Sequence, residues 1–415
     1  MSVFPKQSLR FDAFLEQELK ELSPVNPVRQ QVLKEYGLHL IADKFPSIKK
    51  CADASQEKFN DKMVLQTLND LKFCEPQLLE LRRQLFRTLD KRSAIYLGVD
   101  DVTIQKAGKE IAGVQKLFDH THKTFIDGLL VVDISFRHKG TTYGAQFLLK
   151  SPTMNPKKIK GHSKVVEDIL KQQRLALVQK LLRTLVRELK VAGFKKKTIW
   201  ALFDRWYPSA ALFRFLREIK ISFVVALKRT ANVVLPDKAS WFRSRSIRRG
   251  RKRTHHVREI PIGVFFAQYR SSQWFTPEGQ VGLIESKEAQ VNLVMVGQVK
   301  IIAFLLPTQS EWRFFAASKT LSGAQRAYYI YKKRWPIETV HQDLKEVFGL
   351  KEGHMRREDH VIGHMTFVYF LYNTFVKYKA WLQKCWHVTL SAKQLYDHVV
   401  ASMPWHRDPL QALCT

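Results

Sequence analysis

The chain has 415 residues, of which 45% are hydrophobic, so it is long enough for two or three domains with a sizeable core and is not a disordered protein. Its 69 Lys and Arg outnumber its 38 Asp and Glu, giving a formal net charge of +31. This charge indicates a polyanionic partner, with nucleic acid as the first candidate and an anionic membrane surface as the second. Four scattered cysteines without a CxxC pair argue against a zinc ribbon or a disulfide scaffold.

No segment of the sequence predicts membrane insertion. The first residues, MSVFPKQSLRFDAF, lack the continuous apolar core of a secretory signal. The most apolar helical stretch, 361–376, is shorter than the roughly 20 residues that cross a bilayer and contains His364 and Asn373. We therefore expect a buried core helix there, and a protein of the cytoplasm.

The first part of the chain changes from helical to strand-like periodicity. Residues 1–92 carry apolar side chains at three- and four-residue spacing, which predicts helices. Strands are then expected at 94–101, 113–120, 125–136 and 141–150. A long helix over 164–191, the apolar strand 198–204 and a helix over 209–219 follow.

The second part begins with further strands and ends with helices. Strands are expected at 221–228, 260–270, 281–286, 291–306 and 312–319, and the chain from residue 322 onward is predicted to be helical. Residues 240–258, SWFRSRSIRRGRKRTHHVR, form an intensely basic segment within the strand-rich block. The order of elements predicts an α/β fold with one mixed sheet that a β-rich insertion interrupts.

Two apolar strands are each followed by a carboxylate. Asp100 follows AIYLGV, with Asp101 beside it, and Asp204 follows TIWALF. The carboxyl edge of an open sheet is where binding sites form, although an Asp in such a place also serves as a turn or cap residue. Both interpretations stay open for each residue taken alone.

The stretch YKKRWPIETVHQDLKEVFGL, 331–350, supplies a third carboxylate among cations. In one helix, at about 100° per residue, Tyr331, Arg334, Glu338 and Lys345 fall within an arc of about 60°. Pro336 makes this arc approximate, because proline starts or bends a helix. Arg and Lys bind phosphate oxygens, which leaves the carboxylate of Glu338 for a cation. An exposed helix with ordinary ion pairs is the alternative.

This Tyr-x2-Arg-x3-Glu-x6-Lys spacing resembles the signature of a large group of bacterial insertion-sequence transposases of the DDE type. The segment VDDVTIQKAGKEIAGVQKLFDHTHK, 99–123, resembles the block with the family's first catalytic Asp, and ALFDRWYPS, 201–209, resembles the block with its second. The resemblance runs from about residue 94 to 350. The family usually has Thr or Ser two residues after its first Asp. Here Val102 follows Asp100 at that spacing and Thr103 follows Asp101, but the distance to Lys106 favours Asp100.

The resemblance implies a ribonuclease-H-like catalytic core that cuts DNA at transposon ends and joins the ends to target DNA. Asp100, Asp204 and Glu338 would hold two Mg²⁺ ions, for which Mn²⁺ is a substitute. Tyr331, Arg334 and Lys345 would bind the phosphate at the transposon end. The expected division of the chain is a helical DNA-binding region, the first part of the core, the β-rich insertion, the second part of the core and a C-terminal helical region, at 1–92, 93–220, 221–309, 310–385 and 386–415.

Further contacts with double-stranded DNA are expected from the basic segment, since Arg and Lys without acidic partners bind phosphates. The residues concerned are Arg243, Arg245, Arg248, Arg249, Arg251, Lys252 and Arg253. Trp241 and Trp206 are candidates for stacking on an unpaired base, and packing is the alternative for each. Two protomers are expected in the DNA complex, at the bacterial nucleoid. A related nuclease without strand transfer and an inactive DNA-binding regulator are the alternative functions.

Overall fold

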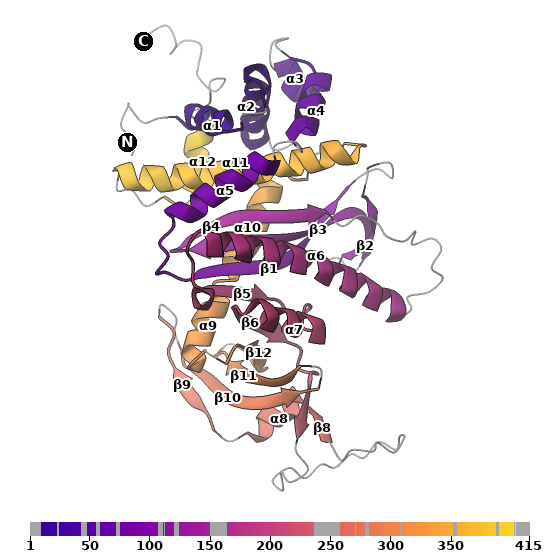
Figure 1. Cartoon of the computed structure of the whole chain (residues 1–415), viewed down its shortest axis with the longest axis vertical. Coiled ribbons are helices and arrows are strands. Elements are labelled where there is room, and N and C mark those ends of the chain that lie inside the picture. The colour runs from indigo at the N-terminus through magenta and orange to yellow at the C-terminus, as the bar shows by residue number, and fades with distance from the viewer. Residues whose placement is uncertain are drawn as a thin grey trace. The chain divides into compact units, whose positions relative to one another are not determined.

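The structure is a computed structural model of the chain (Figure 1). It describes residues 10–22, 25–42, 48–54, 59–71, 75–106, 111, 113–119, 124–149, 164–235, 258–269, 271–278, 282–294, 296–307, 309–319, 321–351, 355–386, 390–401 and 403. The chain divides into two compact units. Unit 1 consists of Met1–Asp90, Asp101–Arg174 and Pro336–Thr415, and unit 2 of Lys91–Asp100 and Leu175–Trp335. The five predicted segments are a finer division, which stays a prediction.

Unit 1 begins with five helices: α1 (Phe11–Lys20), α2 (Pro27–Ala42), α3 (Ile48–Ala54), α4 (Asp61–Asp70) and α5 (Glu75–Thr88). In α1 the residues Phe11, Leu15 and Leu19 are buried at four-residue spacing, so one stripe of the helix faces the core. The helix α4 begins where the side chain of Asn60 accepts a hydrogen bond from the backbone N–H of Met63 at 2.9 Å. The predicted helical character of this region is confirmed.

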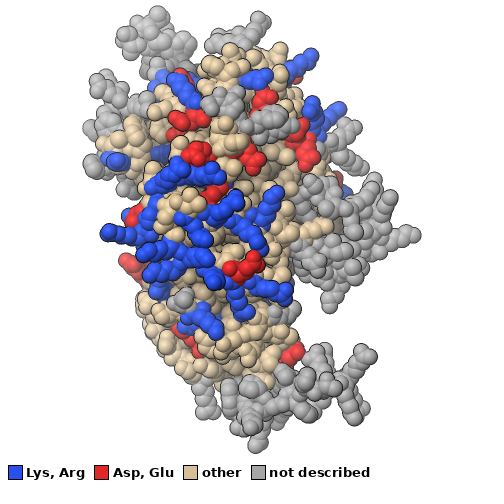
Figure 2. Space-filling model, in the orientation of Figure 1, with Lys and Arg blue, Asp and Glu red and all other residues tan. Residues whose placement is uncertain are grey.

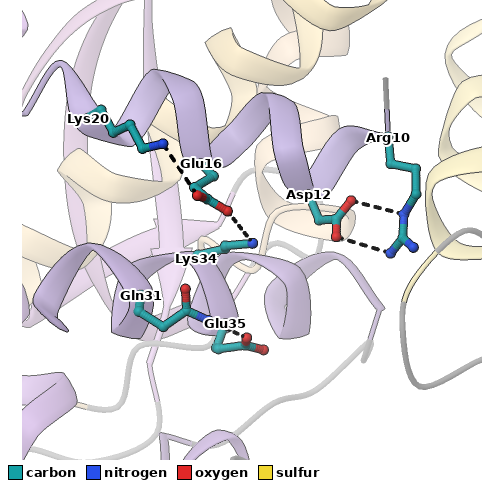
Figure 3. A network of polar contacts seen from close by, with 7 residues as sticks. All are labelled: Arg10, Asp12, Glu16, Lys20, Gln31, Lys34 and Glu35. Carbon is teal, nitrogen blue, oxygen red and sulfur yellow. Dashed lines mark hydrogen bonds and ion pairs between the residues drawn. The ribbon is translucent and has the colours of Figure 1, made fainter. Parts of the chain in front are cut away.

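A network of polar contacts joins α1 to α2 on their solvent side (Figure 3). The Nζ of Lys34 donates to Glu16 at 2.7 Å, and Lys20 lies 3.4 Å from the same carboxylate. The hydrogen bond from Lys34 lowers the pKa of Glu16 below its ordinary value. Exposed pairs of this kind contribute little stability each, so the apolar stripe carries most of the packing of these helices.

Unit 1 also contains the first part of α6 (Lys164–Val191), α10 (Trp335–Glu346), whose first residue belongs to unit 2, α11 (Glu358–Trp386) and α12 (Ala392–Ala401). The helix α11 lies against α1, α2 and α4, so segments far apart in the sequence share one core (Figure 1). At its crossing with α4, a Cβ on Gly363 would collide with the backbone carbonyl of Leu68. The close approach of these two helices therefore requires glycine at position 363.

Strands of unit 1 form an antiparallel group. These are β2 (Gln115–Asp119), β3 (Thr124–His138), β4 (Thr141–Leu149) and the second part of β1 (Ile95–Gln105). The strand β3 pairs antiparallel with β2 and with β4, and it also neighbours β1. Most of its residues from Leu129 to Phe136 are apolar and buried, which suits a strand covered on both faces.

Unit 2 is built on parallel strands that continue into antiparallel ones. The first part of β1 pairs parallel with β5 (Ile199–Phe203), and β5 pairs parallel with β6 (Ser222–Leu227). The order then runs through β12 (Arg313–Ala317), β11 (Gly297–Leu305), β10 (Ile284–Leu293), β7 (Asn232–Leu235) and β8 (Arg258–Pro261), with β9 (Gln273–Phe275) beside β10. The predicted α/β fold with a large mixed sheet and helical N- and C-terminal regions is confirmed, and the strands of the expected insertion extend this sheet.

Helices of unit 2 are the second part of α6 (Lys164–Val191), the short 3₁₀ helix η3 (Lys196–Thr198), α7 (Ala210–Ile219), α8 (Ile262–Gln268) and α9 (Ala324–Lys332). The expectation of a strand at 260–270 is wrong, because α8 occupies most of that range. Ile262, Phe265 and Phe266 are its buried residues, and their three- and four-residue spacing is that of a helix. Among the described helices of both units, none has the length and apolar character of a membrane span.

Candidate active site

The carboxylates Asp100 and Asp204 occupy equivalent places on two neighbouring parallel strands of unit 2. The register of β1 and β5 ends with the pair Val99 and Phe203, and each Asp is the next residue along its strand. Every residue of β5 is buried, whereas both Asp residues are half-buried. Because the two strands run in the same direction, their pairing brings both carboxylates to one edge of the pairing, where open sheets form sites.

The strand β1 is longer than predicted. It continues for five residues beyond Asp100, to Gln105, so the strand end expected at 101 is wrong. What ends at Asp100 is the pairing with β5. The side chains of Tyr96 and Asp100 lie on the same face of β1, since residues of a strand alternate between its faces.

Arg334, in the turn that follows α9, reaches Asp100. Ala324, Ala327 and Ile330 are the buried residues of α9, and they belong to a core cluster with Trp200 and Leu202 of β5. The chain turns after α9, with the N–H of Arg334 donating to the carbonyl of Tyr331 at 2.9 Å.

The Nη2 of Arg334 donates to Oδ2 of Asp100 at 2.7 Å. The side chains of Arg334 and Asp100 are only 9% and 19% exposed, so this charge-assisted bond is shielded from water and fixes the carboxylate. The phenol ring of Tyr331, three residues earlier in the chain, packs on Phe315 of β12 with 4.5 Å between ring centroids. The structure therefore brings Arg334 into contact with Asp100 within unit 2, and Tyr331 packs on β12 in the same unit.

Asp204 opens the turn that leads to α7. The backbone N–H of Arg205 donates to its Oδ1 at 2.5 Å, and the N–H of Tyr207 donates to its carbonyl at 3.2 Å. The hydroxyl of Ser209 then caps α7 by accepting from the N–H of Leu212 at 3.2 Å. These bonds hold the Asp204 carboxylate beside the carboxyl end of β5.

Trp206, one of the two aromatic candidates, lies in the same turn. Its side chain is 48% exposed, and the Nζ of Lys228 lies 4.1 Å from its ring centroid. The guanidinium of Arg205 is 5.7 Å from the same ring. An exposed aromatic ring with adjacent cations has the composition of a stacking platform for bases. Trp241 and the seven basic residues from Arg243 to Arg253 lie outside the described residues.

Asp101 points away from Asp100 along β1 and has its own partner. Its Oδ2 lies 3.3 Å from Nη1 of Arg174 on α6, within unit 1. A partly buried ion pair of this kind serves the packing of a helix on a strand. The two adjacent Asp residues therefore differ in these partners, because Asp100 contacts Arg334 of the motif and Asp101 contacts Arg174 of α6.

Glu338 and Lys345 both lie on α10, within unit 1. Glu338 is exposed and Lys345 is half-buried. Seven residues make nearly two helical turns, so both side chains lie on one face of α10. Val340, His341 and Leu344 are buried in unit 1. The meeting of Glu338 and Lys345 with Asp100 and Asp204 stays a prediction. Among the residues that the structure describes, no group of three His, Cys, Asp or Glu could hold a metal ion.

The sequence interpretation missed a buried side chain, Asp133, that holds α10 in place. Asp133 of β3 is fully buried, and its Oδ1 lies 2.6 Å from Nε2 of His341. The hydroxyls of Tyr369 and Ser135 donate to its Oδ2 at 3.1 and 3.3 Å. A signal was present, because a charged residue inside the apolar run LLVVDISF requires buried hydrogen-bond partners. This cluster fixes the rotation of α10, which carries Glu338 and Lys345 on its outer side.

Two family models match the chain. Residues 64–274 match a family described as DDE superfamily endonuclease, and residues 176–374 match a family described as transposase DDE domain. The first match contains Asp100 and Asp204, and the second contains Asp204 and the motif from Tyr331 to Lys345.

No curated protein matches the sequence. The piggyBac transposase, solved as a synaptic complex with hairpin DNA, is similar at 11% identity with a TM-score of 0.46, over 94% of this chain and 77% of that one. The family matches, the first of which spans more than half of the sequence, show that the chain belongs to the DDE superfamily of endonucleases and transposases.

Proposed function

We propose that the chain is a transposase that cuts DNA at the ends of a mobile element and transfers the cut ends into target DNA. The observation that carries this proposal is the equivalent placing of Asp100 and Asp204 on adjacent parallel strands, with Arg334 of the motif 2.7 Å from Asp100. Two carboxylates that each follow the last residue of one parallel strand pairing carry like charges, which a bound cation would offset, so the pair is suited to binding metal.

Glu338 is proposed as the third carboxylate. It follows Arg334 by four residues, which span at most about 14 Å of extended chain, so the chain itself limits how far it can lie from the partner of Asp100. Glu338 is exposed on α10. Asp133 and His341 serve this role indirectly, because they hold α10 in one orientation.

Two divalent cations, Mg²⁺ with Mn²⁺ as a substitute, are the proposed cofactors. The three proposed ligands offer only carboxylate oxygens, which suit Mg²⁺ and lack the nitrogen and sulfur ligands of a structural zinc site. Asp100, Asp204 and Glu338 would hold the ions. When bound, a metal pair lowers the barrier to in-line displacement at phosphorus by activating the attacking hydroxyl and stabilising the leaving oxygen.

The remaining motif residues are proposed to bind the DNA. Lys345 and the hydroxyl of Tyr331 would donate to phosphate oxygens near the reacting bond. Arg334, held by Asp100 in this structure, would place its other guanidinium N–H groups toward the same phosphate. Arg243, Arg245 and the basic residues up to Arg253 would contact the backbone of the duplex, and Trp206 or Trp241 would stack on an unpaired base. Two protomers would hold the two ends, at a bacterial nucleoid.

A cleavage and joining assay tests the function. The purified chain is incubated with DNA carrying the inverted repeats that flank its gene, together with a plasmid target and Mg²⁺. Nicking at the repeat followed by joining to the plasmid is the expected result. Nicking without joining would identify the alternative nuclease, and binding without nicking would identify the inactive regulator.

Lys345→Ala tests the assignment of the motif. We expect weaker binding of the DNA end and slower cleavage, with only a small change in melting temperature, because Lys345 is half-buried and not part of the core. Lys332→Ala is the matched control, since Lys332 is an exposed lysine at the end of α9 outside the motif. A large fall in melting temperature for Lys345→Ala would show a structural role instead.

A further inference from the structure

A second polar feature of unit 2 lies where β5 and β6 begin, away from the carboxylates. It is a groove of about 650 Å³ lined by residues before β5, at the end of α7, at the start of β6 and after β12. A backbone hydrogen bond joins two of its lining residues, since the N–H of Ser318 donates to the carbonyl of Phe223 at 3.1 Å. Asp204 lies at the other end of β5, and the five steps from Ile199 to Asp204 span about 17 Å at strand spacing.

Five of the described residues that line this groove are cations: Lys196, Lys197, Arg217, Lys220 and Lys319. None of the described lining residues is acidic. Arg217 donates to the carbonyls of Val296 and Gln298 at 2.9 and 3.0 Å, and Lys319 donates to the side-chain oxygen of Gln298 at 3.0 Å. These acceptors are neutral, so they position the cations without cancelling their charge. Glu218, the acidic residue of α7, is paired with Arg183 at 2.9 Å.

The composition of the groove identifies the kind of anion that it fits. Five positive charges in one groove match a polyanion better than a single small anion. The one aromatic residue in its described lining, Phe223, is only 5% exposed, so the groove offers no ring on which an unpaired base could stack. Lys and Arg also gather on the face of the molecule where α6 and α7 lie, with few acidic side chains among them (Figure 2).

We propose that this groove binds the phosphate backbone of duplex DNA at a point separate from the reacting bond, without reading its sequence. This inference rests on the proposed function, because it assumes that the same chain acts on DNA at Asp100 and Asp204. It adds a second contact, which would hold either the DNA that flanks the element end or the target duplex. Both sources present the same ligand, a double row of phosphates.

A paired substitution tests the groove. Lys220→Gln with Lys319→Gln removes two exposed charges from it, and Lys384→Gln with Lys393→Gln removes two exposed charges from α11 and α12 of unit 1 as a matched control. Affinity for a random-sequence duplex is measured over a range of salt concentrations. We expect the groove variant to reduce the slope of log K against log salt by nearly two, at about 0.9 per lost phosphate contact.

Cleavage of a short duplex that holds only the element end should be unchanged in the groove variant, which separates this proposal from the proposed function. Loss of the affinity gained from longer flanking DNA would identify the flank as the occupant, and loss of strand transfer from pre-cleaved ends would identify the target. An unchanged salt slope, an equal fall in the control variant, or stronger binding of single strands than of duplex would each overturn the proposal.

Discussion

Two aspartates on strands show opposite uses of the same side chain. Asp133 of β3 in unit 1 is fully buried and accepts hydrogen bonds from Tyr369 and Ser135 beside its contact with His341. Asp100 of β1 in unit 2 is bonded to Arg334 but keeps 19% of its side chain exposed.

The difference shows how a structural carboxylate can be told from a candidate catalytic one. A fully buried carboxylate is stable only when its oxygens have partners, so Asp133 is committed to the fold. Asp100, at the edge of a strand pairing, is only half-buried and is bonded to a residue of the proposed DNA-binding motif. If this comparison holds, substitution of the site carboxylates should remove activity and leave stability intact. Substitution of Asp133 should reduce stability and leave the chemistry of the site intact.

The largest effect is expected for Asp204→Asn. Losing this charge should reduce metal-dependent cleavage at least about a thousandfold, equal to about 4 kcal/mol in the barrier. Asn keeps the shape and the hydrogen bond with the N–H of Arg205, so the melting temperature should not change. Cleavage of element-end DNA and duplex binding are measured side by side. Wild-type activity in this variant would remove Asp204 from the site.

The next effect is expected for Asp133→Ala. Removing the carboxylate leaves His341 and the hydroxyl of Tyr369 buried without their acceptor, which should reduce the free energy of unfolding by about 3 kcal/mol. Asp127→Ala is the control on the same strand, because Asp127 pairs with a largely exposed Lys116 and should cost less than about 1 kcal/mol. Urea unfolding measures both, and equal losses would contradict the distinction.

A smaller, pH-dependent effect is expected for Asp343→Asn on α10. Burial, reinforced by Glu346, raises the pKa of Asp343 from 3.8 to about 6. The folded state therefore holds this proton more tightly than the unfolded state, and the stability it contributes is lost as pH rises through about 6. The variant should be more stable than the wild type at pH 7, by about 1 kcal/mol after allowance for partial exposure.

The pH dependence itself checks the cause of this gain. At pH values below the ordinary pKa of Asp343, the side chain is neutral in both folded and unfolded states, so thermal unfolding of the variant and the wild type should coincide. A constant difference across the whole pH range would show that the substitution acts through packing and not through charge.

The smallest effect is expected for Glu16→Gln in the network of α1 and α2. Because Lys34 lowers the pKa of Glu16, the pair stabilises the fold above the ordinary pKa of 4.5, and this stability is lost as pH falls through the lowered value. The loss at pH 7 should be about 0.5 kcal/mol and should shrink in high salt. Glu35→Gln is the control, since Glu35 bonds the neutral Gln31 at 2.8 Å. Equal salt dependence of both variants would exclude the ion pair as the cause.

Most of the fold followed from periodicity, and the failures have physical reasons. The buried parallel strand β5 and the amphipathic helix α7 were predicted nearly to the residue, because their apolar patterns are regular. At 260–270 the density of aromatic and β-branched residues favoured a strand, but Ile262, Phe265 and Phe266 repeat with helical spacing. Tertiary burial of that face outweighed the local preference.

The site was predictable in its residue types and less so in its contacts. The sequence placed Asp100 and Asp204 each after an apolar strand, and the resemblance to DDE transposases is what assigned them to one site. The bond from Arg334 to Asp100 joins residues 234 positions apart, and no local pattern encodes it. The anchor of Asp133 on His341 likewise depends on the packing of α10 against β3, although the lone charge in an apolar strand signalled that a partner exists.

The sharing of one core by α1, α2, α4 and α11 has a consequence for biosynthesis. The N-terminal helices emerge from the ribosome first, yet the surface that covers Phe11 and Leu68 is supplied by α11 nearly three hundred residues later. Unit 2, whose residues end at Trp335, is fully translated before that surface exists. Early fragments of the chain therefore expose apolar helix faces during synthesis, a period in which chaperones would protect them from aggregation.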